Sequence, residues 1–133
     1  MMTPENRSSM KTVIIIAVGG AIGSVARYGA QTYVYKLYPI VFPLGTFLVN
    51  VLGCLLIGVF YALAEKGNLL TPEWRLFLMT GFCGGFTTFS TFAFENANLM
   101  RSSDFLYAGL YILGSVVIGI AAVFLGIFLI KSI

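Results

Sequence analysis

Apolar residues run through most of the chain in four long stretches, separated by short polar connections. A helix needs about 20 apolar residues to cross the roughly 30 Å hydrocarbon core of a bilayer. The segments that reach this length are residues 13–35, 44–64, 74–100 and 105–130. Such short connections place consecutive spans antiparallel. The pattern therefore predicts an all-α membrane protein with four transmembrane helices, with a polar N-terminal tail at residues 1–12 and one four-span domain at residues 13–133.

Composition supports a protein that faces lipid. Hydrophobic residues make up 59% of the chain and charged residues 10%, whereas a soluble domain carries about 25% charge. The net charge of +3 is scattered and forms no basic run. Scattered cations are typical of helix-end anchors and not of a nucleic-acid surface. We therefore expect membrane lipid and no nucleic acid as a partner, and a multi-pass protein of the cell membrane (inner or plasma membrane).

The side chains offer little to metal or catalytic chemistry. Cys54 and Cys83 both lie in apolar stretches, which favours buried packing. Two isolated cysteines in a chain without histidine exclude a zinc site. Glu95 is the single carboxylate deep within a span. No catalytic constellation can be assembled from it, so we do not expect an enzyme.

Two local patterns predict how the helices begin and pack. Thr71 before Pro72 is typical of a helix N-cap with proline at the first helical position. Glycines four residues apart let helix backbones approach closely. This spacing occurs at Gly19 and Gly23, and again in the third span.

The third span is interrupted in its middle, over residues 81–92. Its Gly84-Gly85 pair, followed by two β-branched threonines, makes a poor continuous helix. Backbone groups freed at this depth persist only when they are buried in protein or face water or an ion. Free carbonyls suit a hard cation such as Na⁺. Free N–H groups at the start of the following half-helix attract anions.

Polar side chains recur within the spans. Thr46 and Asn50 are four residues apart and share one helical face, as do Tyr111 and Ser115. For any single hydroxyl, the ordinary interpretation is a hydrogen bond between helices. The set converges on the third span, and polar side chains in hydrocarbon face protein or water. Taken together, these groups favour a wet pathway.

Phe89 and Phe92 are three residues apart and share a helical face beside Ser90 and Thr91. Packing or lipid contact is the ordinary interpretation of such a pair. The edge of an aromatic ring is positive, however, so ring edges turned toward a pore would favour an anion that sheds water. Hydroxyls and the Asn50 amide would donate hydrogen bonds to the same ion. The spans contain no ring of acidic residues of the kind that many cation pores use.

These blocks resemble the Fluc (CrcB) family of fluoride channels, in the right order over nearly the whole chain. The matching motifs are Gly19-Gly20-Ala21-Ile22-Gly23 with Arg27-Tyr28, Phe42-Pro43-Leu44-Gly45-Thr46 with Val49-Asn50 and Gly53, and Gly81-Phe82 with residues 84–92 and Glu95. The third block is the most specific. Phe86 departs from the pattern, which has a smaller aliphatic residue there, and we see no reason for it to alter ion choice.

The resemblance implies a fluoride-selective passive channel built as an antiparallel, dual-topology homodimer. It implies two antiparallel pores per dimer that export fluoride from the cytoplasm. It also implies a structural Na⁺ at the dimer interface, held by the backbone carbonyls of Gly84 and Thr87. We expect residues 84–87 to unwind and the helix to resume over residues 89–92. The implied pore residues are Phe89, Phe92, Asn50, Ser90, Thr91, Thr46, Tyr111 and Ser115, with Arg27 in a vestibule.

Two other functions remain open from the sequence. A small multidrug antiporter is also a four-span, dual-topology dimer, but it needs a carboxylate in its first span, where this chain has Arg27 and no Asp or Glu. A non-transporting scaffold subunit would explain the glycine-rich packing faces but not a broken span rich in hydroxyls. Five Lys or Arg side chains lie on the side of the termini and two on the other. That bias is weak enough to permit insertion in both orientations.

Overall fold

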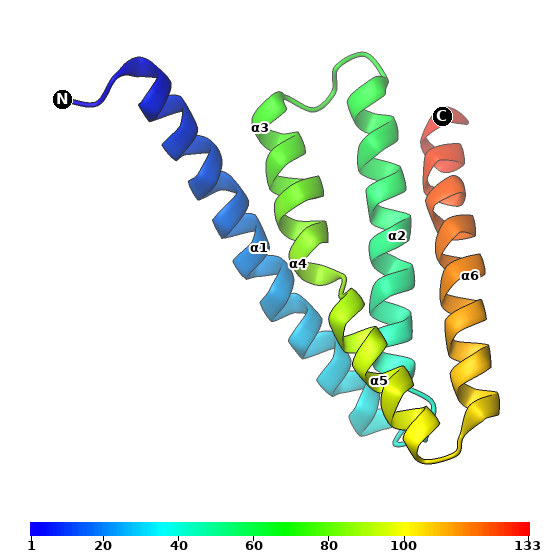
Figure 1. Cartoon of the computed structure of the whole chain (residues 1–133). Helices are drawn as coiled ribbons and strands as arrows, with labels where there is room; N and C mark the ends of the chain where they lie inside the picture. The colour runs from blue at the N-terminus through cyan, green and yellow to red at the C-terminus, as the bar shows by residue number, and fades with distance from the viewer.

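Helices make up nearly the whole molecule, and no strand is present (Figure 1). The computed structural model describes all residues, Met1–Ile133. Its elements are α1 (Pro4–Leu37), α2 (Leu44–Glu65), α3 (Pro72–Arg75), the π-helix η1 (Leu76–Cys83), α4 (Gly84–Phe86), α5 (Phe89–Arg101) and α6 (Phe105–Lys131). The helices from α3 to α5 follow one another as a single bent span. Four helical segments are thus long and apolar enough to cross a membrane, which confirms the predicted architecture.

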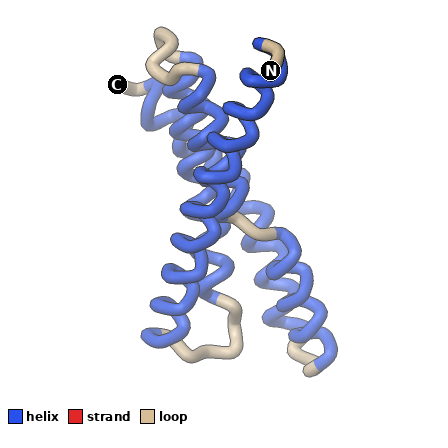
Figure 2. The backbone as a smooth tube through the Cα atoms, turned by 90° about the vertical axis from the view of Figure 1, so that its left-hand side faces the viewer, coloured by secondary structure: helices blue, strands red, loops and turns tan.

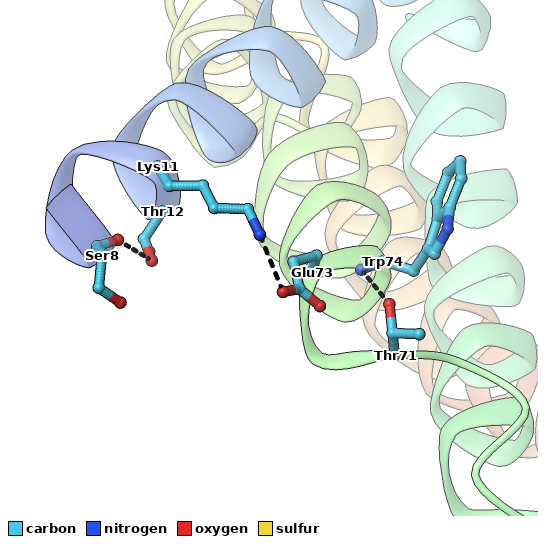
Figure 3. A network of polar contacts seen from close by, with 6 residues as sticks. All are labelled: Ser8, Lys11, Thr12, Thr71, Glu73 and Trp74. Atoms are coloured by element: carbon cyan, nitrogen blue, oxygen red, sulfur yellow. Dashed lines mark hydrogen bonds and ion pairs between the residues drawn. The ribbon is translucent and has the colours of Figure 1, made fainter. Parts of the chain in front are cut away.

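The first helix begins earlier than the apolar pattern alone indicates. It starts at Pro4, where the Thr3 side chain accepts a hydrogen bond from the Asn6 amide at 3.3 Å. Residues 4–12 of the polar tail therefore continue α1 outward. Figure 3 shows Lys11 on this extension reaching Glu73 at the start of α3, with 3.1 Å between Nζ and Oε1. The N-terminus and the C-terminus lie on the same side of the molecule (Figure 1).

The predicted N-cap of the third span is confirmed. Thr71 is extended, and its hydroxyl accepts a hydrogen bond from the Trp74 amide at 3.3 Å (Figure 3). Arg75, one residue later, donates to the Ala64 carbonyl at 2.8 Å and to the Leu70 carbonyl at 3.2 Å. These bonds tie the connection after α2 to the start of the third span.

Glycines bring the helix backbones into direct contact. A Cβ at Gly23 would overlap the Phe82 carbonyl oxygen, and one at Gly85 would overlap the Gly20 carbonyl oxygen. The close approach predicted from the glycine spacing is therefore confirmed for α1 against the third span. Phe86, the residue that departs from the family pattern, is 4% exposed and stacks on Phe82 with ring centroids 5.5 Å apart.

The interruption of the third span is narrower than the sequence predicts. Only Thr87 (φ −82°, ψ 157°) and Thr88 (φ −149°, ψ 118°) are extended, and they form the loop at mid-height in Figure 2. Gly84 is helical, with φ −62° and ψ −38°. Of the residues expected to unwind, 84–87, only Thr87 does so. The expectation is wrong for residues 84–86, because Gly85 packs against α1 as part of a helix and the β-branched threonines adopt the extended backbone that they prefer. The expectation that the helix resumes at Phe89 is confirmed.

The segment before the break also departs from an α-helix. Residues Leu76–Cys83 form a π-helix, which the apolar pattern does not reveal. A π-helical stretch is rare and frequently accompanies a functional site. The widened turns end at Cys83, and only the short helix α4 separates them from the break.

The contact between α2 and α6 yields a matched test of glycine packing. A Cβ at Gly58 would overlap the Val123 carbonyl oxygen, whereas Gly109 in α6 has nothing within 4 Å. Gly58→Ala is therefore expected to cost about 1–3 kcal/mol through overpacking. Gly109→Ala should be neutral or stabilising, by up to about 1 kcal/mol of helix propensity. Thermal unfolding in detergent micelles measures both, and equal melting temperatures for the two variants would contradict the packing shown.

Candidate functional site

An open groove of about 410 Å³ lies beside the break. Its wall combines α2, η1, the break, α5 and α6. Six predicted site residues line it, namely Asn50, Gly84, Thr87, Phe89, Phe92 and Ser115. The remaining lining residues are Gly53, Cys54, Ile57, Met79, Cys83, Thr88 and Val116. None of these side chains carries a formal charge, so the groove is a neutral surface with polar groups at membrane depth.

The side chain of Asn50 forms hydrogen bonds with the backbone of Thr88 in the break. Its Nδ2 donates to the Thr88 carbonyl at 3.1 Å, and its Oδ1 accepts from the Thr88 amide at 2.8 Å. The amide thus supplies both backbone partners that Thr88 loses by leaving the helix. A side-chain amide has two N–H donors, so one donor of Asn50 is left for another acceptor.

The break leaves carbonyl oxygens without their helical donors. In a continuous helix the Thr88 amide would donate to the Gly84 carbonyl, but here it donates to Asn50. No hydrogen bond reaches the Thr87 carbonyl oxygen. Gly84 and Thr87 both line the groove. Unpaired carbonyl oxygens are the hard ligands that suit Na⁺, so the two residues implied as its ligands fit such an ion.

Arg27 contacts the break from α1 instead of standing free. Its Nε donates to the Gly85 carbonyl at 3.1 Å. In a continuous helix that oxygen would accept from Phe89, which the extended residues carry away. The guanidinium therefore stabilises the end of α4 and places a positive charge near the break. This position agrees with the vestibule role that the family resemblance implies. The hydrogen bond to Gly85 gives Arg27 a structural role as well.

The start of α5 presents polar hydrogens at mid-membrane depth. The Thr88 hydroxyl accepts from the Thr91 amide at 3.2 Å and donates to the Thr91 hydroxyl at 3.1 Å. The Ser90 hydroxyl lies 3.5 Å from the same Thr88 oxygen. The first amides of a helix have no partner within it, which applies here to Phe89 and Ser90. This end of α5 is also the positive end of its dipole.

The two predicted pore phenylalanines differ in environment. Phe89 is 79% exposed at the groove, and its ring centroid lies 5.7 Å from that of Phe92. Phe92 stacks on Tyr111 at 4.9 Å, and Tyr111 is fully buried. The rings of Phe89, Phe92 and Tyr111 therefore lead from the groove into the interior between α5 and α6.

A second polar cluster surrounds Glu95, which lies farther toward the C-terminal end of α5. Its Oε1 accepts from the Thr46 hydroxyl at 2.7 Å and from the Tyr35 hydroxyl at 3.3 Å. Its Oε2 accepts from the Tyr111 hydroxyl at 2.8 Å. Gln31 donates to Thr46 at 3.0 Å. Thr46 and Tyr111 therefore do not line the groove, but hold the one carboxylate within the spans.

Glu95 also borders a second cavity, of about 240 Å³, at the end of the molecule opposite the termini. Its other lining residues are Tyr35, Ile40, Val41, Pro43, Asn98, Leu99, Ser102 and Asp104. The structure thus arranges the groove, the stacked rings, the Glu95 cluster and this cavity in sequence along α5.

Several residues of this arrangement were not predicted as site residues. Glu95, Tyr35 and Gln31 were not among the predicted site residues, and neither was Thr88. Only Glu95 carried a usable signal, as the single carboxylate deep within a span. Ser115 was predicted and does line the groove, where its buried hydroxyl has no hydrogen-bond partner.

Comparison with known proteins decides the family. A family model described as "CrcB-like protein, Camphor Resistance (CrcB)" matches residues 14–127. The chain belongs to the CrcB family. A CrcB relative from Flavobacterium psychrophilum is 46% identical over 123 residues, covering 92% of this chain and 99% of its own length. The resemblance inferred from the sequence motifs is confirmed.

Other relatives carry the same name. One from Chlorobium phaeobacteroides is 48% identical over 120 residues, covering 89% of this chain and 91% of its own. One from Chlorobaculum tepidum is 50% identical over 122 residues, covering 92% and 96%. All three relatives are named "Fluoride-specific ion channel FluC". That is the name of a channel and not of an enzyme, in agreement with the prediction.

The role of Asn50 at the break can be tested against Asn98, an asparagine of α5 outside the break. Asn50→Leu leaves the buried Thr88 amide and carbonyl without partners, at a cost of about 1–3 kcal/mol. Asn98 is exposed and makes no side-chain hydrogen bond, so Asn98→Leu should be near neutral. We expect a lower melting temperature and faster hydrogen exchange at the Thr88 amide for Asn50→Leu alone. Unchanged exchange at Thr88 would show that Asn50 does not hold the break.

Proposed function

We propose that this CrcB-family chain is a fluoride-selective channel through which fluoride leaves the cytoplasm passively. The observation that carries the proposal is the break at Thr87 and Thr88. It brings the unpaired amides at the start of α5, aromatic rings and hydroxyls to one uncharged groove. The identity of the ion is inferred from the relatives, because the three relatives described above are named fluoride-specific ion channels.

The proposed ion path follows α5 from the groove to the second cavity. Fluoride enters at the groove, which Phe89 and Ser115 line, and there it meets the free amides at the start of α5 and the Ser115 hydroxyl. It passes the edges of Phe89 and Phe92, which are positive. It then reaches the hydroxyls around Glu95 and leaves through the cavity bordered by Asn98 and Ser102. At each step protein donors replace water, and no single site holds the ion tightly.

Selectivity follows from the chemistry of the donors. Fluoride is smaller than chloride and a far stronger hydrogen-bond acceptor, so it loses more when water is removed. Hydrogen bonds from amide and hydroxyl donors offset the hydration that fluoride loses, whereas the same hydrogen bonds to chloride are weaker. The hydroxyls of Thr46, Tyr35 and Tyr111 donate to Glu95, and each hydroxyl has one hydrogen to give. Fluoride at this step takes these hydrogen bonds over from the carboxylate.

The open side of the groove supports a homodimer. Unpaired backbone groups at membrane depth do not face lipid, because each costs several kcal/mol in hydrocarbon. A second copy that covers the groove removes this exposure. The weak charge bias between the two ends supports insertion of the copies in opposite orientations. Two antiparallel copies would give two pores.

A structural Na⁺ between the copies is part of the same proposal. The carbonyl oxygens of Gly84 and Thr87 from each copy would hold it. A bound hard cation would neutralise these oxygens and tie the copies together at the break. The fit rests on the loss of helical donors to both oxygens.

The direction of transport follows from acid chemistry. Hydrogen fluoride is a weak acid that crosses membranes as a neutral molecule and dissociates in the more alkaline cytoplasm. Fluoride is then trapped inside unless an anion path exists. An inside-negative potential drives the anion outward through a passive pore, so export needs no ATP and no coupled proton.

Ion efflux from proteoliposomes tests the function. We expect liposomes that contain the purified chain to release fluoride, measured with a selective electrode, and to retain chloride under the same gradient. Absence of both fluxes would favour a scaffold protein. Uptake of a lipophilic cation driven by a proton gradient would favour an antiporter.

Two phenylalanines of α5 provide matched variants for the same assay. Phe92 stacks on Tyr111 along the proposed path, whereas Phe94 is 64% exposed and makes no aromatic contact. Phe92→Ala removes the ring edge that the proposed path uses, and a loss of about 1.4 kcal/mol of anion stabilisation would slow fluoride efflux about tenfold. Phe94→Ala should leave efflux unchanged. Equal efflux in both variants would remove Phe92 from the path.

A further inference from the structure

A basic basin lies at the end of the molecule that holds both termini. The basin, of about 640 Å³, is lined by Ala62, Ala64, Glu65, Lys66, Asn68, Arg75 and Lys131. It combines the end of α2, the connection after it, the start of the third span and the end of α6. Figure 1 shows the end of α6 beside the end of α2. Three cations and one carboxylate give the basin a net positive charge.

The three cations are held in place by bonds to the chain. Arg75 donates to the Ala64 carbonyl at 2.8 Å and lies 3.4 Å from the Asn68 side-chain oxygen. Lys66 donates to the Ile130 carbonyl at 3.2 Å. Lys131 pairs with Glu65 at 3.6 Å. Each cation keeps further N–H donors, since a lysine ammonium has three and a guanidinium five. The basin therefore presents prearranged donors around an open space.

The surroundings of the basin are apolar and exposed. Leu69 and Trp74 flank it along the chain and are 63% and 55% exposed. Phe128, in the last turn of α6, is 65% exposed. A cationic recess bordered by apolar side chains matches a molecule with a phosphate at one end and acyl chains at the other. The cavity at the opposite end differs, since Glu95 and Asp104 line it and no Lys or Arg does.

We propose that the basic basin binds the phosphate headgroup of an anionic phospholipid. Basic pockets between transmembrane helices bind such headgroups, and each Lys or Arg near the surface adds to the attraction. Arg75 contributes the charge of its guanidinium and the donors of Nη1, since its Nε and Nη2 donate to the chain, and Lys66 and Lys131 contribute point charges. The acyl chains lie along the exposed apolar side chains beside the basin. This site is independent of the proposed ion path, so it stands whether or not the chain conducts fluoride.

Lipid-dependent unfolding tests the basin. The purified chain is heated in a neutral detergent with increasing phosphatidylglycerol, phosphatidylcholine or inorganic phosphate. We expect phosphatidylglycerol to raise the melting temperature well above the effect of phosphatidylcholine, and inorganic phosphate to have no such effect. In the double variant Lys66→Gln/Lys131→Gln, the concentration of phosphatidylglycerol needed for half the shift should rise by on the order of tenfold. Lys66→Arg/Lys131→Arg should restore the response.

A charge-matched variant at the other end serves as the control. Lys36→Gln/Arg101→Gln removes two cations as well, and it should respond to phosphatidylglycerol as the unaltered chain does. Equal shifts with the two lipids, an undiminished response of the Lys66/Lys131 glutamine variant, or an equal loss in the control would overturn the proposal. A full shift with inorganic phosphate alone would assign the basin to free phosphate instead of lipid. If the Lys66→Gln/Lys131→Gln variant does not fold, the single variants Lys66→Gln and Lys131→Gln are heated with the same lipids and judged by the same outcomes.

Discussion

The structure depends on how the chain satisfies its backbone at one break inside a membrane. A helix that stops at Phe86 and restarts at Phe89 frees amides and carbonyls where no water is available to them. Asn50 supplies both partners for Thr88, and Arg27 takes the Gly85 carbonyl. Residues of α1 and α2 thus stabilise an irregularity in the third span. Without them, that span would have to close into a continuous helix.

The groups that remain unpaired give the break its chemistry. On one side are the carbonyl oxygens of Gly84 and Thr87, which attract a cation. On the other are the first amides of α5, which attract an anion. The two sets differ in sign, and along the chain only Thr88 lies between them. In the proposed channel, one short segment serves a fixed cation and a moving anion without any charged side chain in the groove.

Close helix packing makes this arrangement possible. The break is held by side chains from α1 and α2, which must lie very near the third span. Gly23 and Gly85 permit that approach, because any Cβ at either position would meet backbone atoms. Glycine at Gly85 consequently serves contact and not unwinding. The bulk of Phe86 fills the space next to these small residues and stacks on Phe82.

Much of this fold could be predicted from the sequence, because the signals are local. The four spans, the Thr71 cap and the close packing at the spaced glycines each depend on neighbouring residues, and all are confirmed; only the first helix begins earlier than predicted. The position of the break was predicted correctly, but its predicted length was too great, because the sequence does not distinguish a glycine in a helix from a glycine in a loop. The π-helix η1 left no pattern.

The Glu95 cluster was missed for a different reason. Tyr35, Thr46 and Tyr111 come from three helices, so only the packing brings them to one carboxylate. The antiparallel dimer, the Na⁺ and the fluoride contacts stay predictions, because they involve atoms outside a single chain.

The most direct test of the break as an anion site is to observe its amides while fluoride binds. We would label the chain with ¹⁵N in detergent micelles and titrate it with sodium fluoride, using sodium chloride as the control. We predict that the Phe89 and Ser90 amide resonances shift in a saturable manner with fluoride and do not shift with chloride. Resonances that stay in place with fluoride, or that shift equally with chloride, would contradict an anion site at the start of α5.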